Sequence, residues 1–523
     1  MFGAFLCPRY SPSLFPEATA VTSAIYITTP IYYANDLPHV GHAYTTIAAD
    51  ALARYHRLQG RDVFLLTGTD EHGINIERIA AQRGLNPRQH VDAIATSFQT
   101  LWGTLDIQYD RFVRTTEPAH ERAALEVWRR LRASGDLFRG IYEGVYCPRC
   151  EAYYQAEDLV NGDCPVHGLP CDQVREENTF FRLSRYQGAL ERLIRDTEFV
   201  QPEARRRELL GFLRQGLKDF SVTRRQVRWG IPIPDAPGEV LYVWVDALAN
   251  YLSGIGFPDD PGQFSRYWPA HTHLVGKEII RFHCLYWPAL LLSAGLPLPR
   301  RVFAHGWLTK DGQKISKTTG NAIDPAALAT EFGSDAVRYY FLRAIPFGQD
   351  GDYTRAAFVA RYNADLANDF GNLVQRATVL ATRYGAGRET GSATLCEAEE
   401  LIRGRAATLP ARVEEAIQRY ALHEAIAAVG ELVREANRYV ETTAPWHLAK
   451  AGAQSRLATV LWHITEAARV AAWHLLPVLP RAGAEAHRRL SGHSPQPGEG
   501  VFGYQQRAGS VSAGTPLFPR IAA

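Results

Sequence analysis

AIYITTPIYYANDLPHVGHAYT, residues 24–45, carries the pattern on which the predicted fold rests. Residues 24–29 alternate β-branched and aromatic side chains, a pattern typical of a β-strand. A loop with Pro, Asn and Asp follows, and helical periodicity then runs from Gly41 to Leu58. The first unit is therefore a strand, a loop and a helix.

The same order repeats along the chain. A second strand is predicted over 62–67, and helices follow over 73–84 and onward to about 132. Further along the chain, strands are predicted at 240–245, 274–275 and 302–305, with a helix over 278–294. This order predicts an α/β fold, a Rossmann-type doubly wound parallel sheet whose ligands bind beyond the carboxyl ends of its strands. From about 358 to 479 the pattern is helical and predicts a bundle.

Composition restricts the class of protein. The chain has 523 residues, 46% hydrophobic and 21% charged, enough for several domains, and no apolar run of about 18 residues that would cross a membrane. Its net charge of +2 means that a nucleic-acid partner needs local basic surface. Candidates are Arg205, Arg206, Arg207, Arg224 and Arg225, for which a solvated helix face is an equal alternative.

Two short motifs carry the predicted chemistry. His39-Val40-Gly41-His42 stands where the first loop enters a helix, so both histidines share one face at its positive end. DGQKISKTTGN, residues 311–321, places Lys314 and Lys317 in a glycine-flanked turn, although few lysines occur elsewhere. Taken singly, each motif also fits an ordinary helix start or an exposed hairpin tip.

Together these motifs resemble the HIGH and KMSKS signatures of class I aminoacyl-tRNA synthetases. Longer stretches resemble the bacterial methionyl-tRNA synthetases: ITTPIYYANDLPHVGHAYT, LLTGTDEHG, LYVWVDALANYL, HLVGKEIIRFHCLYWPALL, FAHGWLTKDGQKISKTTGN and NRYVETTAPWHLAK. The resemblance implies an ATP-dependent ligase that makes methionyl-adenylate and pyrophosphate, then loads methionine onto initiator and elongator tRNA(Met). ATP would enter with Mg²⁺, and no P-loop motif is present.

The resemblance also implies roles for particular residues. The catalytic set is His39, His42, Lys314 and Lys317; ATP contacts add Gly41, Gly276, Glu278 and His305; the methionine pocket comprises Ile31, Tyr33, Asp70, Trp244, Ala247, Leu248, Tyr251, Phe282 and His283. Three positions depart from the family pattern. Ile315 and Thr318 replace the second and last residues of KMSKS, and Glu278, a longer carboxylate, stands where the family usually has an Asp in the adenosine loop.

A metal site is predicted between the two halves of the catalytic domain. Cys147-x2-Cys150-x13-Cys164-x2-His167 gives two ligand pairs whose spacing fits one tetrahedral Zn²⁺. Four protein ligands leave no open position, so the ion is expected to be structural. Cys171 is an alternative to His167, and reduced buried thiols without a metal are the other interpretation.

In the helical region, Asn372 and Arg376 lie four residues apart and share a helix face, and Trp446 follows Ala444-Pro445 at a helix start. The resemblance makes these three residues the readers of the anticodon. Packing in a core or on a surface is the alternative for each residue taken singly.

The resulting domain organisation is a catalytic Rossmann-type domain with a zinc-knuckle insert, followed by an all-α anticodon-binding bundle. The two catalytic halves are expected over 23–139 and 226–306, with the insert over 140–225 between them. The KMSKS loop and stem-contact segment follow over 307–358 and the bundle over 359–490. A leader over 1–22 is disordered or outside the true start, and a tail over 491–523 is disordered or folded back as a strap.

The remaining expectations concern the cellular context. Free cysteines and a metal site predict a reducing cytoplasm, and the absence of an appended tRNA-binding module predicts a monomer. Two rival functions remain open: a synthetase for another apolar amino acid or cysteine, and a tRNA-binding paralogue without catalytic activity.

Overall fold

The computed structural model describes residues 24–147, 152–154, 159–165, 168–315, 321–385, 395–504 and 510–522; of 152–154 and Lys314 it describes only the backbone. Within this part of the chain, no helix is long and apolar enough to cross a membrane. The expected leader lies outside the described residues.

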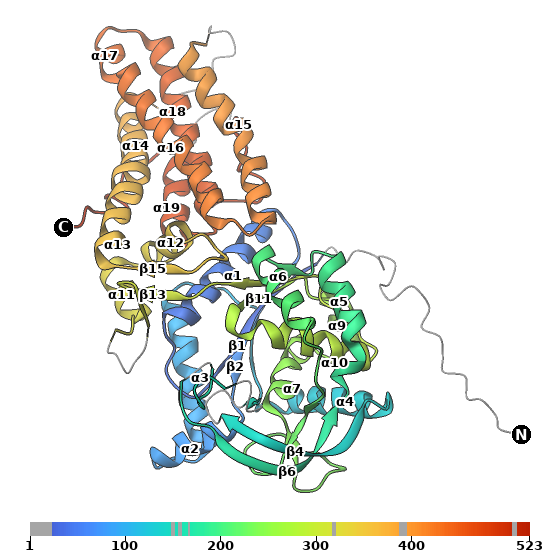
Figure 1. The fold of residues 1–523 in the computed structure, drawn as a ribbon. Helices are drawn as coiled ribbons and strands as arrows, with labels where there is room; N and C mark the ends of the chain where they lie inside the picture. Colours follow the sequence, from blue (N-terminus) through green and yellow to red (C-terminus); the bar gives the residue numbers. More distant parts are fainter. Residues whose placement is uncertain are drawn as a thin grey trace, which may run out of the picture.

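A six-stranded sheet of order β3-β2-β1-β11-β12-β7 forms the centre of the lower half of the molecule (Figure 1). All its pairings are parallel, which confirms the predicted class of fold. The strands are β1 (Ile25–Tyr33), β2 (Val63–Asp70), β3 (Arg111–Arg114), β7 (Val200–Gln201), β11 (Thr272–Gly276) and β12 (Val302–His305).

The sheet is covered on both faces because its strands are apolar on both sides. Ile25 and Ile27 of β1 pack into one buried core with α1, whereas Tyr26 packs into a second core with α4 and α10. This alternation follows from the two-residue period of a strand. The covering helices are α1 (Val40–Leu58), α2 (Ile74–Gln82), α3 (Pro87–Thr104), α4 (Pro118–Ala133), α9 (Pro261–Tyr267) and α10 (Trp287–Ser293).

The insert is built on a long antiparallel hairpin of β4 (Leu137–Cys147) and β6 (Asp172–Phe181), extended by β5 (Ala152–Tyr154) and β8 (Phe220–Ser221). Helices α5 (Gln187–Asp196) and α6 (Glu203–Leu213) follow it. The sequence indicated a metal knuckle here. The described part adds a sheet in which Cys147 ends β4 and Asp172 begins β6, on the neighbouring strand.

The strand predicted over 240–245 is wrong. β10 ends at Leu241 and pairs antiparallel with β9 (Thr223–Arg224), outside the parallel sheet, and α7 begins at Val243. Alternating aromatic and β-branched residues are typical of a strand, but a short apolar run also fits a buried helix. α7 (Val243–Leu248) is such a helix, and α8 (Asn250–Ser253) follows it.

The helix predicted over 278–294 is divided into three pieces. A 3₁₀ turn at Lys277–Ile279 and a π-helical turn at Phe282–Tyr286 precede α10. π-helical turns inside helices frequently mark functional sites. This one holds Phe282 and His283, two residues that the resemblance assigns to methionine.

The upper half of the molecule is a bundle of long helices (Figure 1). It comprises α13 (Arg355–Arg361), a π-helical segment at Tyr362–Gly371, α14 (Asn372–Tyr384), α15 (Glu397–Gln418), α16 (Leu422–Thr443), α17 (Pro445–Lys450), α18 (Gln454–Leu475) and α19 (Pro480–Ser491). α17 lies at the end of the bundle farthest from the sheet (Figure 1).

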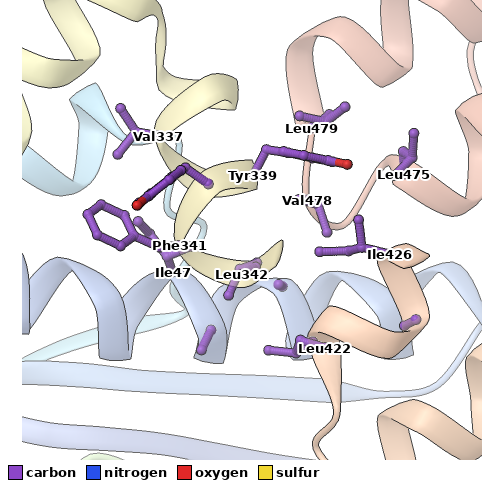
Figure 2. Close-up of a cluster of buried hydrophobic side chains, with 14 of the residues drawn as sticks. Ile47, Val337, Tyr339, Phe341, Leu342, Leu422, Ile426, Leu475, Val478 and Leu479 are labelled. Carbon is purple, nitrogen blue, oxygen red and sulfur yellow. The ribbon is translucent and has the colours of Figure 1, made fainter. Parts of the chain in front are cut away.

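Apolar packing joins the bundle to the sheet domain through α12 (Ser334–Ala344), which follows α11 (Pro325–Phe332). Figure 2 shows α12 side chains between Ile47 of α1 and the bundle residues Leu422, Ile426, Leu475, Val478 and Leu479. Arg338 is fully buried in this junction. It donates to Asp50 at 2.6 Å and to the carbonyl groups of Pro477 and Val478 at 2.8 and 3.0 Å, so one charge pair ties both domains together.

The described tail folds back along the bundle, which favours the strap over the disordered alternative for these residues. Phe518 is buried against the bundle, and the Asn363 side chain exchanges two hydrogen bonds of 2.9 Å with the backbone of Ile521.

Candidate active site

Neighbouring strand ends bring predicted site residues together at one edge of the sheet. Tyr33 at the end of β1 pairs with Asp70 at the end of β2, and Gly276 of β11 pairs with His305 of β12. The strand order reverses between β1 and β11, which is where an open α/β sheet binds its ligands.

The first motif forms the start of α1. His39 is the N-cap residue: its Nδ1 accepts from Gly41 N at 3.1 Å, and His42 Nδ1 accepts from His39 N at 3.3 Å. The two rings stack with centroids 3.7 Å apart. Because each Nδ1 accepts a hydrogen bond, each neutral ring carries its proton, and so its one N–H donor, on Nε2. The motif therefore caps the helix and also offers donors beyond it.

His305 lies behind this helix start. Its Nδ1 donates to the Gly306 carbonyl at 2.8 Å, so its Nε2 accepts from the Thr45 hydroxyl at 2.7 Å. Burial lowers the pKa of His305 and keeps the ring neutral. With both nitrogens engaged, the ring positions α1 against β12.

Aromatic side chains form the wall predicted for methionine. Trp244 of α7 stacks on Phe282 of the π-helical turn, with centroids 3.7 Å apart. The Tyr251 hydroxyl donates a hydrogen bond to His283 Nε2 at 2.7 Å, and His283 Nδ1 donates one to the Ile279 carbonyl at 3.0 Å. Burial lowers the pKa of His283 to about 4, so this wall is uncharged at neutral pH.

Sequence analysis missed His273, which stacks on Tyr251 with centroids 4.1 Å apart. Its Nδ1 lies 2.7 Å from the Thr28 hydroxyl, and its buried Nε2 has no hydrogen-bond partner among the described residues. Burial and the nearby His283 lower its pKa. A polar residue inside the apolar strand β11 was the only signal available in the sequence.

A buried carboxylate holds α7 in place. Asp246 is fully buried and accepts from His72 Nδ1 and His120 Nε2, each at 2.7 Å. Burial would raise the pKa of Asp246, but the His72 charge and the two hydrogen bonds outweigh it and lower the pKa. Burial acts to lower the pKa of His72, yet the Asp246 charge prevails and raises it. This pair links the loop after β2 to the helix that presents Trp244.

Glu71, next to Asp70, is the centre of a second buried network that sequence analysis missed. It accepts from Arg114 at 2.6 and 3.0 Å and from the Thr69 and Thr116 hydroxyls. A fully buried carboxylate needs such compensation. The network holds the end of β2 rigidly.

Glu278 turns its carboxylate back over Gly276 and accepts from Trp307 Nε1 at 2.8 Å. A Cβ at position 276 would lie 2.2 Å from the Glu278 carboxylate, so a larger residue there would displace this carboxylate from its present position. Beside them, Lys277 pairs with Asp350 at 2.7 Å and lies over the Trp307 ring.

The lysine loop begins on a small sheet of β13 (Leu308–Lys310), β14 (Gln313–Lys314) and β15 (Gly351–Tyr353). Asp311 and Gly312 have positive φ angles of 53° and 74°, the conformation of a two-residue hairpin turn. The backbone of Lys314 is described as part of β14, whereas Lys317 and Thr318 lie outside the described residues.

The predicted metal site is described in part. Cys147 and Cys164 are buried, and Cys171 lies beside Cys147 because Tyr146 pairs with Asp172 across the hairpin. Burial and the neighbouring thiols of Cys147 and Cys164 raise the pKa of Cys171 to about 11. Cys150 and His167 lie outside the described residues. Three cysteines therefore converge, and Cys171 stays a candidate ligand.

The three predicted anticodon residues lie on adjoining elements of the bundle. Asn372 of α14 donates to Asn437 of α16 at 3.3 Å, and Arg376 pairs with Glu441 at 3.3 Å. α16 ends shortly after Glu441, and Trp446 follows on α17 with 39% of its surface exposed. Asn437 and Glu441 were not anticipated as partners.

The arginines suggested as basic surface are engaged in ion pairs or buried. Arg205 pairs with Glu208, and Arg206 and Arg207 pair with Glu203 on the same helix. Arg225 pairs with Glu239. Arg224 is buried and donates to backbone carbonyls, so its assignment to a nucleic-acid surface is wrong.

The family model described as tRNA synthetases class I (M) matches residues 25–173 and 170–378. With the histidine motif at the switch point of the sheet and the lysine hairpin after β12, fold and site define a class I aminoacyl-tRNA synthetase. The methionine–tRNA ligase of Thermotoga maritima is 44% identical over 503 residues, spanning 95% of this chain and 80% of the relative. The chain belongs to the methionyl-tRNA synthetase family.

Other relatives agree. The methionine–tRNA ligase of Nostoc is 45% identical over 472 residues, 89% of each chain. The Mycobacterium tuberculosis methionyl-tRNA synthetase in complex with methionyl-adenylate has a TM-score of 0.90 at 41% identity, over 95% of this chain and all of the other. The chain is therefore a methionine–tRNA ligase: it activates methionine with ATP and transfers it to tRNA(Met).

Proposed function

We propose that methionyl-adenylate forms at the strand ends of β1, β2, β11 and β12, with the residues named below in separate roles. The observation that carries this proposal is the convergence there of the α1 start, Asp70, Gly276 and the Trp244–Phe282 stack. The mycobacterial relative named above is a complex with methionyl-adenylate, which supports placing the intermediate here.

In this proposal, methionine lies against an uncharged aromatic wall with its ammonium on Asp70. A thioether gains favourable sulfur–ring contacts from aromatic side chains. Tyr251 and His283 satisfy each other, so neither of these two wall residues presents an unmet polar group to the methionine side chain, which disfavours polar amino acids. The lining set is Ile31, Tyr33, Asp70, Trp244, Ala247, Leu248, Tyr251, Phe282 and His283.

ATP lies across the start of α1. The Nε2–H groups of His39 and His42 donate to phosphate oxygens at the positive end of the helix. Gly41 and Gly276 allow close approach of the nucleotide, Glu278 accepts from the ribose, and His305 acts as a positioning residue through Thr45.

The chemical step is displacement at phosphorus. A methionine carboxylate oxygen attacks the α-phosphorus, a P–O bond forms, and the bond to the β-phosphate breaks and releases pyrophosphate with its electron pair. Lys314 and Lys317 stabilise the charge that gathers on the leaving phosphates, and Mg²⁺ arrives with the ATP substrate. Catalysis is positioning plus electrostatic stabilisation.

The insert binds one structural Zn²⁺ through Cys147, Cys150, Cys164 and His167. Buried, converging thiols fit this ion, and it would hold the end of the β4–β6 hairpin. Zinc measurement in Cys147→Ser and Cys164→Ser proteins tests the site. His167→Ala compared with Cys171→Ala identifies the fourth ligand, because only the true ligand's loss lowers affinity.

The bundle tip reads the anticodon of tRNA(Met). The indole of Trp446 stacks on an unpaired base, and the Asn372 amide and the Arg376 guanidinium meet base edges. Both side chains have exchangeable partners, Asn437 and Glu441, at 3.3 Å. The Asn372 contact is part-buried and the Arg376 contact is exposed, and both are long enough to be weak and replaceable by a ligand.

We place the enzyme in the cytoplasm as a monomer. The exposed large apolar side chains of the described residues belong to separate segments of the chain, which supports a monomer; they include Leu37, Ile141, Trp307, Leu401 and Trp446. Light scattering of the purified enzyme tests the monomer, and a dimer mass would contradict it.

ATP–pyrophosphate exchange and aminoacylation, run side by side, test the assignment. We expect exchange with methionine above a panel of amino acids that includes isoleucine, leucine, valine and cysteine. Faster pyrophosphate exchange with another amino acid would contradict the assignment of the pocket to methionine. No exchange with any amino acid, together with intact tRNA binding, would identify the chain as a paralogue without catalytic activity.

A further inference from the structure

The C-terminal end of the bundle holds a second cluster of metal-ligating side chains, far along the chain from the cysteines. His487 lies on α19, and His493 and Glu499 lie in the segment that follows it. One nitrogen from each ring and one carboxylate oxygen all fall within 4.8 Å of one another.

The spacing of these atoms fits an ion better than direct hydrogen bonds. His487 Nε2 lies 3.3 Å from Glu499 Oε2, and His493 Nε2 lies 3.6 Å from Glu499 Oε1. Ligand atoms around a tetrahedral Zn²⁺ at about 2.0–2.2 Å stand about 3.3–3.5 Å apart. His487 is fully buried, and its Nε2 makes no hydrogen bond with any described residue.

Neighbouring groups orient all three side chains towards this centre. His493 Nδ1 donates to the Ser494 carbonyl at 2.9 Å, so the lone pair of the neutral ring is on Nε2, the atom that lies 3.6 Å from Glu499 Oε1. His487 Nδ1 lies 3.1 Å from the Ser491 hydroxyl, and Glu499 Oε2 accepts from Gln496 N at 2.8 Å. Such outer contacts are typical of metal ligands.

The charge of Glu499 also requires a partner. Its side chain is 3% exposed, and its carboxylate forms no ion pair with an arginine or lysine of the described residues. Arg469, the neighbouring cation, pairs with Glu466 at 2.7 and 2.8 Å. It reaches Glu499 through the backbone carbonyl oxygen and not through the carboxylate. A buried carboxylate is costly without compensation.

We propose that His487, His493 and Glu499 bind one divalent transition-metal ion, foremost Zn²⁺. Two imidazoles and a carboxylate are borderline ligands that suit Zn²⁺, whereas Mg²⁺ and Ca²⁺ prefer oxygen alone. His493 is 43% exposed, so the fourth position faces solvent and takes water.

The ion fastens the chain after α19 to the bundle. In this segment the Gln496 carbonyl accepts from Trp473 Nε1 at 2.9 Å and the Gly500 carbonyl from His474 Nε2 at 3.0 Å. The metal adds a cross-link between α19 and these contacts. It acts as a structural clip.

Zinc stoichiometry of the full-length enzyme tests this site. After loading with Zn²⁺ and desalting, we expect one fewer Zn²⁺ per chain in His493→Gln and in Glu499→Gln than in the unsubstituted enzyme. Zn²⁺ should also raise the Tm of the unsubstituted enzyme more than that of either variant. His423→Gln, a half-buried histidine on α16, is the matched control and should keep both properties.

The proposed cysteine site is measured separately. Cys147→Ser lacks the cysteine-bound ion and should still bind Co²⁺ at the C-terminal site, giving tetrahedral d–d absorption without a thiolate charge-transfer band. Equal stoichiometry in His493→Gln and the unsubstituted enzyme, or loss of all binding in Cys147→Ser, would overturn the C-terminal site and identify the cluster as a histidine–carboxylate ion pair.

Discussion

The sheet edge and the far tip of the bundle present their functional side chains in opposite ways. At the sheet edge, His283, His305 and Asp246 are buried and all their polar atoms are engaged. At the tip, Trp446 is 39% exposed and Arg376 has one long contact to a mostly exposed Glu441. A small substrate needs a rigid site before it binds, whereas a splayed nucleic-acid base can order flexible side chains as it arrives.

The largest expected effect comes from the junction that connects the two regions. Arg338→Met should lower the free energy of unfolding by about 3–5 kcal/mol, because the buried carbonyl groups of Pro477 and Val478 lose their donor and Asp50 keeps only Arg54 as an ion-pair partner. Urea unfolding measures the loss. Arg343→Met on the same helix removes only a 3.9 Å contact and should cost under about 1 kcal/mol. Equal costs in the two variants would contradict the role of the Arg338–Asp50 pair.

The second expected effect is a loss of amino-acid activation at the sheet edge, which does not involve the bundle tip. Lys314→Ala and Lys317→Ala should each remove about 2–4 kcal/mol of transition-state stabilisation, or roughly 30- to 1000-fold in kcat/KM for pyrophosphate exchange. Methionine affinity should change far less. Lys310→Ala, in the same hairpin, is the matched control. Near-normal adenylate formation in both variants would remove the loop from the mechanism.

The third effect concerns the buried support of the sheet edge. Asp246→Asn should cost about 1.5–3 kcal/mol of stability, because two charge-assisted hydrogen bonds are weakened. Asp259→Asn removes only an exposed ion pair with Arg122 and should cost at most about 1 kcal/mol. Denaturant unfolding of both variants makes the comparison.

The pH dependence of the Asp246→Asn cost follows from two pKa shifts. The raised pKa of His72 gives stability that is complete below its unfolded value of about 6.5 and is lost as pH rises through the folded value. The lowered pKa of Asp246 gives stability that is complete above about 3.9 and is lost as pH falls. The cost should therefore be largest between these values and shrink at alkaline pH; a cost that grows there would contradict the assignment.

The smallest effect belongs to the tip. Trp446→Ala should slow aminoacylation by about 5- to 150-fold, the value of about 1–3 kcal/mol for stacking one base, and leave pyrophosphate exchange unchanged. His447→Ala, the exposed neighbour, is the control. Equal losses in both assays would show that Trp446 supports the fold.

Asn372→Ala and Arg376→Ala sharpen the same test. Both should relax discrimination against tRNAs with other anticodons, because base edges carry sequence information and stacking mainly supplies affinity. Aminoacylation of anticodon-substituted tRNA measures this difference. Unchanged discrimination in both variants would remove these residues from base reading.

Local patterns predicted most strands of the sheet and the helix start that carries the histidine motif. Strands β1, β2, β11 and β12 and the start of α1 follow from side-chain periodicity and a capping loop. The prediction failed at 240–245, where the chain leaves β10 and enters α7 within an apolar run. Such a run is compatible with a strand or a buried helix, and packing against the second core decides between them.

The supporting residues could not be predicted from local pattern. His273 and Arg338 are polar residues within apolar segments, whereas Glu71 follows a strand end among other polar residues; the main partners of all three come from other elements of the fold. Periodicity identifies which face of an element is buried, but it does not state which other element covers that face.

The amino-acid sequence by itself determined the class of fold and the family, and it supplied the candidate side chains for methionine, ATP and zinc that stay predictions, because these depend on residue type and on spacing along the chain. Only the tertiary structure decided that Asp246 joins the loop after β2 to α7, that Arg338 joins both domains, and that His487, His493 and Glu499 meet. These contacts depend on where distant segments meet in space, which is set by the summed packing of the whole core.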